Sequence, residues 1–176
     1  MLYPLGKDSS NFTAEMLLKV LGAQVGGLPG TSEKGLAVVR SLLGSPEKET
    51  LINGSGLFSG NLLSPRTLSQ TLERTLAQPN FSPEFISQLS RAGEDGTLYR
   101  RLKNLPTKVS LRAKTGTLFD AVALSGVIFL EDNHSSWVFS ILINDVKGRY
   151  AAARSLSDRL VRHMAAFAAK QQLGAP

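Results

Sequence analysis

Apolar residues in the first two-thirds of the chain recur at helical spacing. Residues 12–21 and residues 32–43 each place apolar side chains three or four positions apart. Gly22 and Gly44 follow these segments as stop signals, and Thr31 can cap the second one by accepting a hydrogen bond from a free amide of its first turn. The pattern therefore predicts two short helices, one over each segment.

Two serine–proline pairs predict further helix starts, at residues 64–65 and 82–83. Serine can cap the free amides of a first turn, and proline fits there because its missing N–H is not needed. Behind the first pair, three leucines fall on one face of the expected helix: Leu68, Leu72 and Leu76.

The pattern changes to that of a sheet after residue 108. Val109, Leu111 and Ala113 alternate with polar residues, which predicts a strand. Residues 121–130 and 137–143 are apolar at almost every position, which favours central strands covered on both faces. The polar residues 131–134 between them suit a hairpin. We therefore expect a three-stranded antiparallel meander.

A final helix follows the turn at residues 147–149. Four large apolar residues line one side of it, and we expect this side to pack on the sheet: Leu156, Leu160, Met164 and Phe167. The predicted fold class is α/β (α+β), an antiparallel sheet flanked by helices. A three-stranded sheet buried on both faces has unpaired edges, so we expect further strands, encoded upstream of Met1, to extend it.

Composition narrows the classes of function. The chain has 176 residues, enough for one domain, and its 42% hydrophobic and 19% charged residues are typical of a globular protein. The net charge is +6, but the basic residues are scattered and not interleaved with aromatic ones, which argues against nucleic-acid binding. The absence of cysteine excludes disulfides, thiol catalysis and cysteine metal sites.

Targeting and metal signals are weak. The first seven residues lack the basic and apolar regions of a signal peptide, and no apolar stretch approaches ~18 residues, so we expect neither a signal peptide nor a membrane span in this chain. His134 and His163 have no metal-ligand spacing and no matching acid for a triad. We expect no metal and no cofactor.

Lys114-Thr115-Gly116-Thr117 is the first candidate for chemistry. The order is wrong for a phosphate loop, whose glycines precede the lysine, and a strand that ends in a glycine turn explains the segment equally well. Its surroundings favour a site, because it closes the first strand beside an apolar hairpin. A lysine and two hydroxyls there can bind a carboxylate, and the glycine lets a ligand backbone approach.

Three further motifs precede this strand in a fixed order. They are Ser9-Ser10-Asn11 with the helical segment 12–19, then Asn53-Gly54-Ser55-Gly56, then Asp95-Gly96-Thr97. The succession resembles the class C low-molecular-mass penicillin-binding proteins, the D-alanyl-D-alanine carboxypeptidase/endopeptidase family (serine peptidase family S13), in its C-terminal part only. The resemblance runs from about Lys7 to Asp145. Such enzymes use S-x-x-K, S-x-N and K-T-G, in that order.

Two other segments match the short motifs formally. Ser59-Gly60-Asn61 also fits S-x-N, but Ser9 is preferred because Asn11 opens a helix of the family's N-x-x-A-E type. Ser45-Pro46-Glu47-Lys48 fits S-x-x-K, but it follows S-x-N and has the composition of an exposed turn or helix cap. We interpret it as structural. The nucleophile and its lysine are then absent from these residues.

The resemblance implies a site and a reaction. A serine supplied from elsewhere would attack the bond between two D-alanines of a peptidoglycan stem peptide, and β-lactams would imitate that substrate. Ser9 would pass a proton to the leaving amine, Asn11 would bind the substrate amide, and Lys114 would add positive potential. Thr115, Gly116 and Thr117 would form the substrate-binding edge, with the Thr117 N–H in the oxyanion hole.

The same resemblance places residues 1–176 in a single partial domain. This domain would be an incomplete β-lactamase/transpeptidase-like fold that lacks the S-x-x-K segment and the inserted domains, in an enzyme of the periplasm or cell envelope. Three alternatives remain open: a non-catalytic module that binds muropeptides or penicillin, a subunit that completes a site in trans with the missing half, and a β-lactamase-like hydrolase. The asparagine-glycine and aspartate-glycine turns are interpreted as scaffold.

Overall fold

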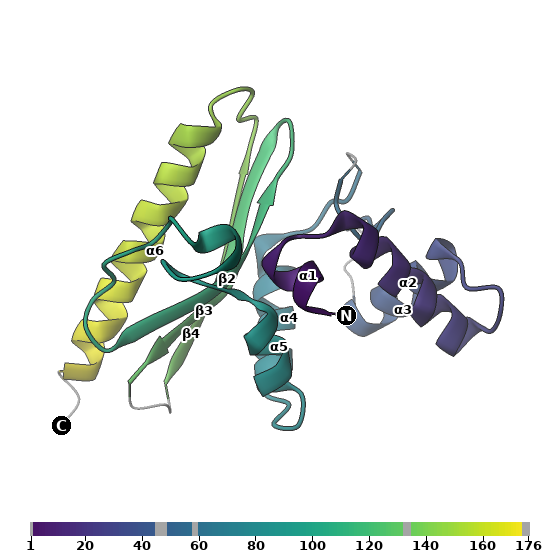
Figure 1. The fold of residues 1–176 in the computed structure, drawn as a ribbon, viewed down its shortest axis with the longest axis horizontal. Coiled ribbons are helices and arrows are strands. Elements are labelled where there is room, and N and C mark those ends of the chain that lie inside the picture. Colours follow the sequence, from purple (N-terminus) through teal and green to yellow (C-terminus); the bar gives the residue numbers. More distant parts are fainter. Residues whose placement is uncertain (1, 45–48, 58–59, 132–134, 174–176) are drawn as a thin grey trace.

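The computed structural model describes residues 2–44, 49–57, 60–131 and 135–173. A sheet backed by a long helix forms one part of the molecule, and a pair of packed helices forms the other, with α1 and α4 between them (Figure 1). The elements in chain order are α1 (Leu2–Lys7), α2 (Asn11–Gly26), α3 (Ser32–Leu43), α4 (Pro65–Leu76), α5 (Ser82–Gln88), β1 (Ser90–Arg91), the 3₁₀ helix η1 (Gly96–Leu98), β2 (Val109–Thr117), β3 (Ala121–Leu130), β4 (Ser136–Asn144) and α6 (Tyr150–Leu173).

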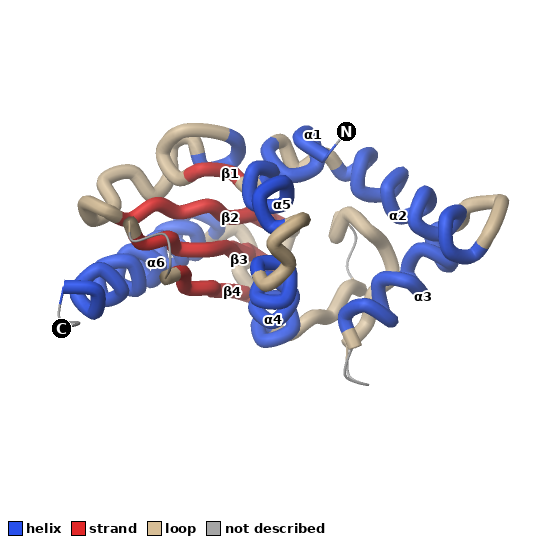
Figure 2. Tube along the Cα trace, turned by 90° about the horizontal axis from the view of Figure 1, so that it is seen from below, coloured by secondary structure: helices blue, strands red, loops and turns tan. Residues whose placement is uncertain are grey.

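The sheet is antiparallel with the order β1-β2-β3-β4. The predicted meander is confirmed, and its register runs without a bulge from Val109↔Leu130 to Thr117↔Val122. Helix α6 packs on one face, and α4 and α5 lie toward the other (Figure 2). The fold class is therefore as expected.

Two details of the sheet differ from expectation. A two-residue strand, β1, joins the meander through the pair Ser90↔Ala113. β4 is an edge strand among the described residues and not a central one. Its apolar side chains are mostly half-buried, and Trp137 is 37% exposed. The apolar run was a poor guide because it indicates that the faces of a strand are covered and not where the strand lies in the sheet, and β4 contacts both α4 and α6.

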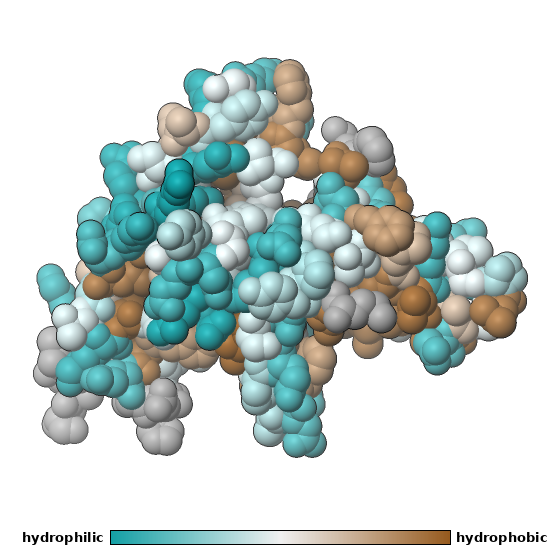
Figure 3. Space-filling model, in the orientation of Figure 1, coloured by the Kyte–Doolittle hydropathy of each residue, from teal (hydrophilic) through white to brown (hydrophobic). Residues whose placement is uncertain are grey.

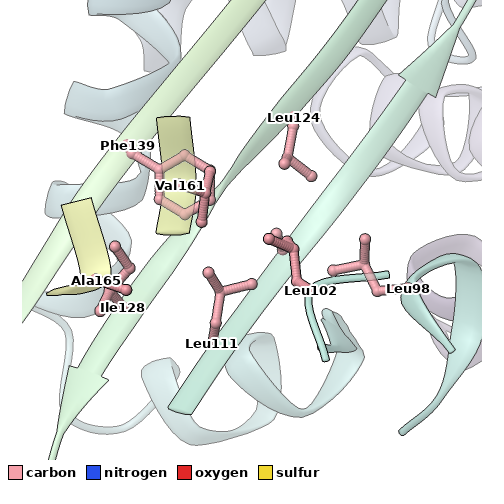
Figure 4. Close-up of a cluster of buried hydrophobic side chains, with 9 residues drawn as sticks. Leu98, Leu102, Leu111, Leu124, Ile128, Phe139, Val161 and Ala165 are labelled. Atoms are coloured by element: carbon pink, nitrogen blue, oxygen red, sulfur yellow. The ribbon is translucent and has the colours of Figure 1, made fainter. Parts of the chain in front are cut away.

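The main core lies between the sheet and α6. Val161 and Ala165 of the helix pack against Leu111, Leu124 and Ile128 of the strands (Figure 4). Each of these five residues is almost fully buried. The core is therefore a contact between one helix and the even-numbered side chains of β3.

The expected packing face of α6 is mostly wrong. Met164 is half-buried and packs against the core as expected. Leu156, Leu160 and Phe167 are exposed, and the buried residues are the smaller Ala153, Ser157, Val161, Ala165 and Ala168. Small side chains let the helix axis approach the strands closely, which brings more of the sheet into van der Waals contact. The Ser157 hydroxyl donates to the Ala153 carbonyl at 2.9 Å, so its burial leaves no polar atom unpaired.

The helical pair also corrects one prediction. The first helix does not end at Gly22 but continues to Gly26. A Cβ at Gly22 would lie 2.6 Å from the Thr31 carbonyl oxygen, and a Cβ at Gly35 would meet the Leu18 backbone. These glycines are the points where α2 and α3 touch. Gly22 is thus explained by the contact between the two helices and not by the end of a helix.

Besides Gly22, the predicted helix caps and ends are confirmed at three positions and wrong at one. Thr31 caps α3 by accepting from the Lys34 amide, Gly44 ends it with φ +59°, and Ser64 caps α4, all as expected. Ser82 is not a cap. It is the first residue of α5, and its own amide already donates to the Gln78 carbonyl at 2.8 Å.

Candidate active site

Ser9 lies in the corner between α1 and α2 with φ +57°. This left-handed backbone is uncommon for a residue other than glycine and is typical of functional sites. The middle residue of the motif, Ser10, is the helix cap: its hydroxyl oxygen accepts from the Thr13 amide at 3.2 Å and the Thr13 hydroxyl at 2.9 Å. Because Ser10 caps α2, the Ser9 hydroxyl is not needed as a cap and can make other contacts.

Lys114 meets Ser9 across the fold. The lysine Nζ donates to the Ser9 hydroxyl oxygen at 2.6 Å and to the Thr115 carbonyl at 2.9 Å, although Ser9 and Lys114 are 105 residues apart. Burial lowers the pKa of Lys114. A lysine with a lowered pKa and a hydroxyl in contact can pass a proton to a third group.

Asn11 lies in the same corner, as the first residue of α2. Its side chain is exposed and has no hydrogen-bond partner within the part of the chain that the structure describes. The amide is thus free to meet a ligand beside Ser9.

The outer edge of β2 is open where the lysine motif lies. β1 pairs only with Arg112 and Ala113. The Leu111 carbonyl accepts from the Ala92 amide on this edge, so strand alternation turns the N–H and C=O groups of Thr115 and Thr117 the same way. No described strand pairs with residues 114–117 here. An open edge with free amides can bind an extended peptide as an added strand.

Hydroxyl groups line one face of this edge. The Thr115 hydroxyl donates to the Thr97 hydroxyl at 2.8 Å, and Arg154 of α6 donates to the Thr117 hydroxyl at 3.2 Å. Gly116 lies between the two threonines, opposite Ala123 of β3. The segment Lys114–Thr117 thus presents a cation on one face of the strand and two hydroxyls on the other.

A buried ion pair fixes the corner to the sheet. Lys7, 3% exposed, donates to Asp95 at 2.6 Å and to the Leu89 carbonyl at 2.7 Å. Burial acts to raise the pKa of Asp95, but the Lys7 hydrogen bond, the Arg91 amide and the nearby positive charges outweigh it and lower the pKa. Lys7 lies two residues before Ser9, and Asp95 two residues before Thr97. The pair therefore links the serine corner to the threonine edge.

Lys7 and Arg154 were not predicted as site residues, and Asp95-Gly96-Thr97 was interpreted only as scaffold, a turn into a short helix. The turn and the 3₁₀ helix are confirmed. The available signal for Lys7 was its place beside Ser9 in an otherwise apolar helix. For Arg154 there was no signal, because its contact with Thr117 spans 37 residues and two elements.

Glu15 holds the asparagine-glycine loop against α2. Its carboxylate accepts from the Gly54 and Ser55 amides at 3.1 and 2.8 Å. Burial acts to raise the pKa of Glu15, but the hydrogen bonds from Ser55 and Gly54 and the charge of Lys19 outweigh it and lower the pKa. Within the loop, Asn53 accepts from the Gly56 amide at 2.7 Å. The contact explains the glutamate of the N-x-x-A-E helix.

The lowered pKa of Glu15 gives a pH-dependent prediction. A carboxyl of this kind adds stability above its unfolded-state pKa and loses it as pH falls through the folded-state pKa. We expect Glu15→Gln to lower the free energy of unfolding by about 1 kcal/mol at pH 7, a modest value because the carboxylate is partly exposed. The difference should shrink below about pH 4. Urea unfolding of the parent and the variant at pH 7 and below about pH 4 measures this difference.

Glu73→Gln is the matched control, since Glu73 is exposed on α4 without a described partner. It should change stability little at either pH. A loss in Glu15→Gln that is equal at pH 7 and in acid would show that the carboxylate charge is not what holds the loop.

The two formal motif matches do not form a second site among the described residues. Ser45–Lys48 and Ser59 lie outside the described residues. Asn61 is a scaffold residue: its Oδ1 accepts from the Ile52 amide at 2.8 Å and its Nδ2 donates to the Asn53 carbonyl at 3.1 Å.

The same described ranges contain no group of three or more His, Cys, Asp or Glu residues that could hold a metal ion. None of the helices described is long and apolar enough to cross a membrane. His134 falls outside these ranges.

Comparison with known proteins decides the family. The sequence model of the D-Ala-D-Ala carboxypeptidase 3 (S13) family matches residues 1–170. The chain belongs to this family. A D-alanyl-D-alanine carboxypeptidase of Actinomadura sp. (strain R39) is 32% identical over 97% of the chain and 32% of its own length. The penicillin-sensitive carboxypeptidase A of Dictyostelium discoideum is 29% identical over 87% of the chain and 31% of its own length. The S13 chain thus spans about a third of these relatives.

Solved structures confirm the fold. Penicillin binding protein 4 from Haemophilus influenzae, complexed with a β-lactam, matches 93% of the chain and 40% of its own length, with a TM-score of 0.79 and 24% identity. A class A β-lactamase from Mycobacterium abscessus matches 92% of the chain and 62% of its own length, with a TM-score of 0.64 and 17% identity. The S13 chain therefore has a β-lactamase/transpeptidase-like arrangement of helices and sheet.

Proposed function

We propose that this S13 chain forms one wall of the active site of a serine-type D-Ala-D-Ala carboxypeptidase or endopeptidase that acts on peptidoglycan stem peptides. The observation that carries the proposal is the 2.6 Å contact of Lys114 Nζ with the Ser9 hydroxyl, beside the open edge of β2. A proton relay next to a free strand edge suits acyl transfer on an extended peptide.

Each residue then has a role in the reaction. Ser9 passes a proton toward the leaving D-alanine amine, and Lys114 supplies positive potential to this step. Asn11 donates to the substrate amide. Thr115 and Thr117 bind the terminal carboxylate, and the Thr117 N–H forms one arm of the oxyanion hole, a donor worth about 3 kcal/mol in the transition state.

The nucleophile of this proposal comes from an S-x-x-K segment outside the 176 residues, in the same polypeptide or in trans. Residues 1–176 are then one partial domain that is completed by this segment, in an enzyme of the periplasm or cell envelope. Exposed apolar side chains support the idea of a missing neighbour. Figure 3 shows brown residues over α2 and α3. Within these two helices and the loop that joins them, the most exposed apolar side chains are Phe12, Leu28 and Leu42.

An apolar hollow points to the same neighbour. It measures about 370 Å³ and opens between α2, α3 and residues 51–56 and 61–63. Most of the residues that line it are apolar, among them Leu5, Leu17, Leu21, Val39 and Leu63. A buried helix that begins with the nucleophile would fill such a space and bring its first turn near Ser9.

Covalent labelling by a fluorescent penicillin tests the proposal. The chain alone should not be labelled. A chimaera in which residues 1–170 replace the aligned segment of the Actinomadura carboxypeptidase should be labelled at the serine of its S-x-x-K motif, and benzylpenicillin should compete. A folded chimaera that binds penicillin without a covalent bond would support a binding module instead, and labelling of Ser9 or Ser45 in the chain alone would contradict the assignment of the nucleophile.

A further inference from the structure

The positive charge beside Thr115 and Thr117 comes from α6 and not from the lysine of the motif. Successive side chains of a strand point to opposite faces, so Lys114 lies on the face opposite the two threonines. Its amine is already engaged by the Ser9 hydroxyl and the Thr115 carbonyl. A carboxylate bound by the threonine hydroxyls would therefore be separated from Lys114 by the backbone of the strand.

Arg154 is placed on the threonine face. Its guanidinium donates one hydrogen bond, to the Thr117 hydroxyl at 3.2 Å. None of the described acidic groups forms an ion pair with it, whereas Arg101 on the same side of the sheet is paired with Asp158 at 2.8 Å. Arg154 is an exposed residue, its guanidinium has no other hydrogen bond among the described residues, and a guanidinium can bind both oxygens of a carboxylate.

The backbone that carries Arg154 is held against the end of β2. The Tyr150 hydroxyl donates to the Phe119 carbonyl at 2.7 Å, and the Val146 amide donates to the Asp120 carbonyl at 3.0 Å. The first bond joins the first residue of α6 to the turn that follows Thr117, and the second joins the segment just before α6 to the same turn. The guanidinium is therefore positioned by the fold and not only by its own flexible side chain.

We propose that Arg154 is a specificity-determining residue that completes a carboxylate site with the hydroxyls of Thr115 and Thr117. The site selects ligands with a free C-terminal carboxylate over those in which that group is neutral. The inference rests on the proposed function for the identity of the peptide, but the charge selection itself rests only on the contacts of Arg154.

The test uses the full 176-residue chain and two probes, N-acetyl-D-alanyl-D-alanine and its C-terminal amide. Binding is followed by the chemical shifts of the Thr115 and Thr117 amides. We expect the acid to bind the parent chain about tenfold more tightly than the amide. Arg154→Gln should remove most of this preference, Arg154→Lys should keep part of it, and Arg159→Gln, at an exposed arginine on the same helix, should leave it unchanged.

Other outcomes overturn the proposal. These are equal binding of acid and amide by the parent, no binding of the acid, or a preference that survives in Arg154→Gln. Equal weakening of both probes in Arg154→Gln would also overturn it, since that result indicates a structural role. Thermal unfolding of each variant separates such a role from recognition. The labelling of the chimaera is a separate measurement, so the carboxylate site can stand when the proposed function fails, and the reverse.

Discussion

Replacing Lys7 with methionine is expected to lower the free energy of unfolding by about 3 kcal/mol, because it takes the ion-pair partner from Asp95 and leaves only the Arg91 amide and the charge of Arg112 to stabilise that carboxylate. Lys7 is almost fully buried, and its amine bonds both Asp95 and the Leu89 carbonyl. Removing one partner of such a pair exposes the full desolvation cost of the other. Asp95 keeps 37% of its side chain exposed, which holds the loss at the lower end for buried pairs.

Two variants isolate the buried pair. Lys108→Met breaks the Lys108–Glu131 pair, whose side chains are both more than 60% exposed, and it should change stability by less than about 1 kcal/mol. The double variant Lys7→Met/Asp95→Asn should recover part of the loss, because it removes the uncompensated charge. Urea unfolding measures all of them. A loss in Lys7→Met no larger than in Lys108→Met would show that the pair does not hold the corner.

The ion pair has a functional consequence as well. Lys7 fixes the corner that carries Ser9, and Asp95 fixes the turn whose Thr97 accepts from Thr115. The distance from Ser9 to the β2 edge is therefore set by groups that do not touch the ligand. Rigid support of this kind is what a site needs in order to hold a substrate in reactive geometry.

Local signals in the sequence predicted most of the fold. The meander, the caps at Thr31 and Ser64, and the turn into α6 depend on residues close to one another in the chain. Apart from Ser82, whose amide donates to the nearby Gln78 carbonyl, the failures discussed next concern contacts between distant elements. Gly22 looked like a helix end because the approach of α3 is invisible in the sequence of α2. The larger side chains of α6 looked like its core face because hydrophobicity does not show how closely a helix can approach a sheet.

The candidate site likewise contains residues that the motifs predicted and residues that only the structure shows. Ser9, Asn11 and the lysine strand were selected by an ordered set of motifs, and the structure brings Ser9 and Lys114 into contact. Lys7–Asp95 and Arg154–Thr117 join segments 88 and 37 residues apart, and no short motif contains both partners of either pair. Side-chain alternation along β2 also separates Lys114 from the two threonines, a distinction that the motif alone does not show.

Replacing Lys114 with methionine is expected to lower the rate of penicillin acylation of the chimaera by about 10²–10³-fold. Methionine keeps the length of the side chain but cannot donate to Ser9, so the proton relay to the leaving amine is lost. The second-order rate constant for labelling, measured at pH 7, gives the size of the effect. Lys170→Met, at an exposed lysine near the end of α6, should label at the parent rate.

Stability should change much less in this variant than in Lys7→Met. Burial lowers the pKa of Lys114, so its protonated form is disfavoured in the folded state. That penalty is fully present below the folded-state pKa and is lost as pH rises from the folded-state pKa to the unfolded-state pKa. Removing the amine relieves the penalty but also removes two hydrogen bonds, so unfolding should change by no more than about 1 kcal/mol. A large loss of stability, or acylation at the parent rate, would contradict the role of Lys114 as a group that acts in the reaction and not in the fold.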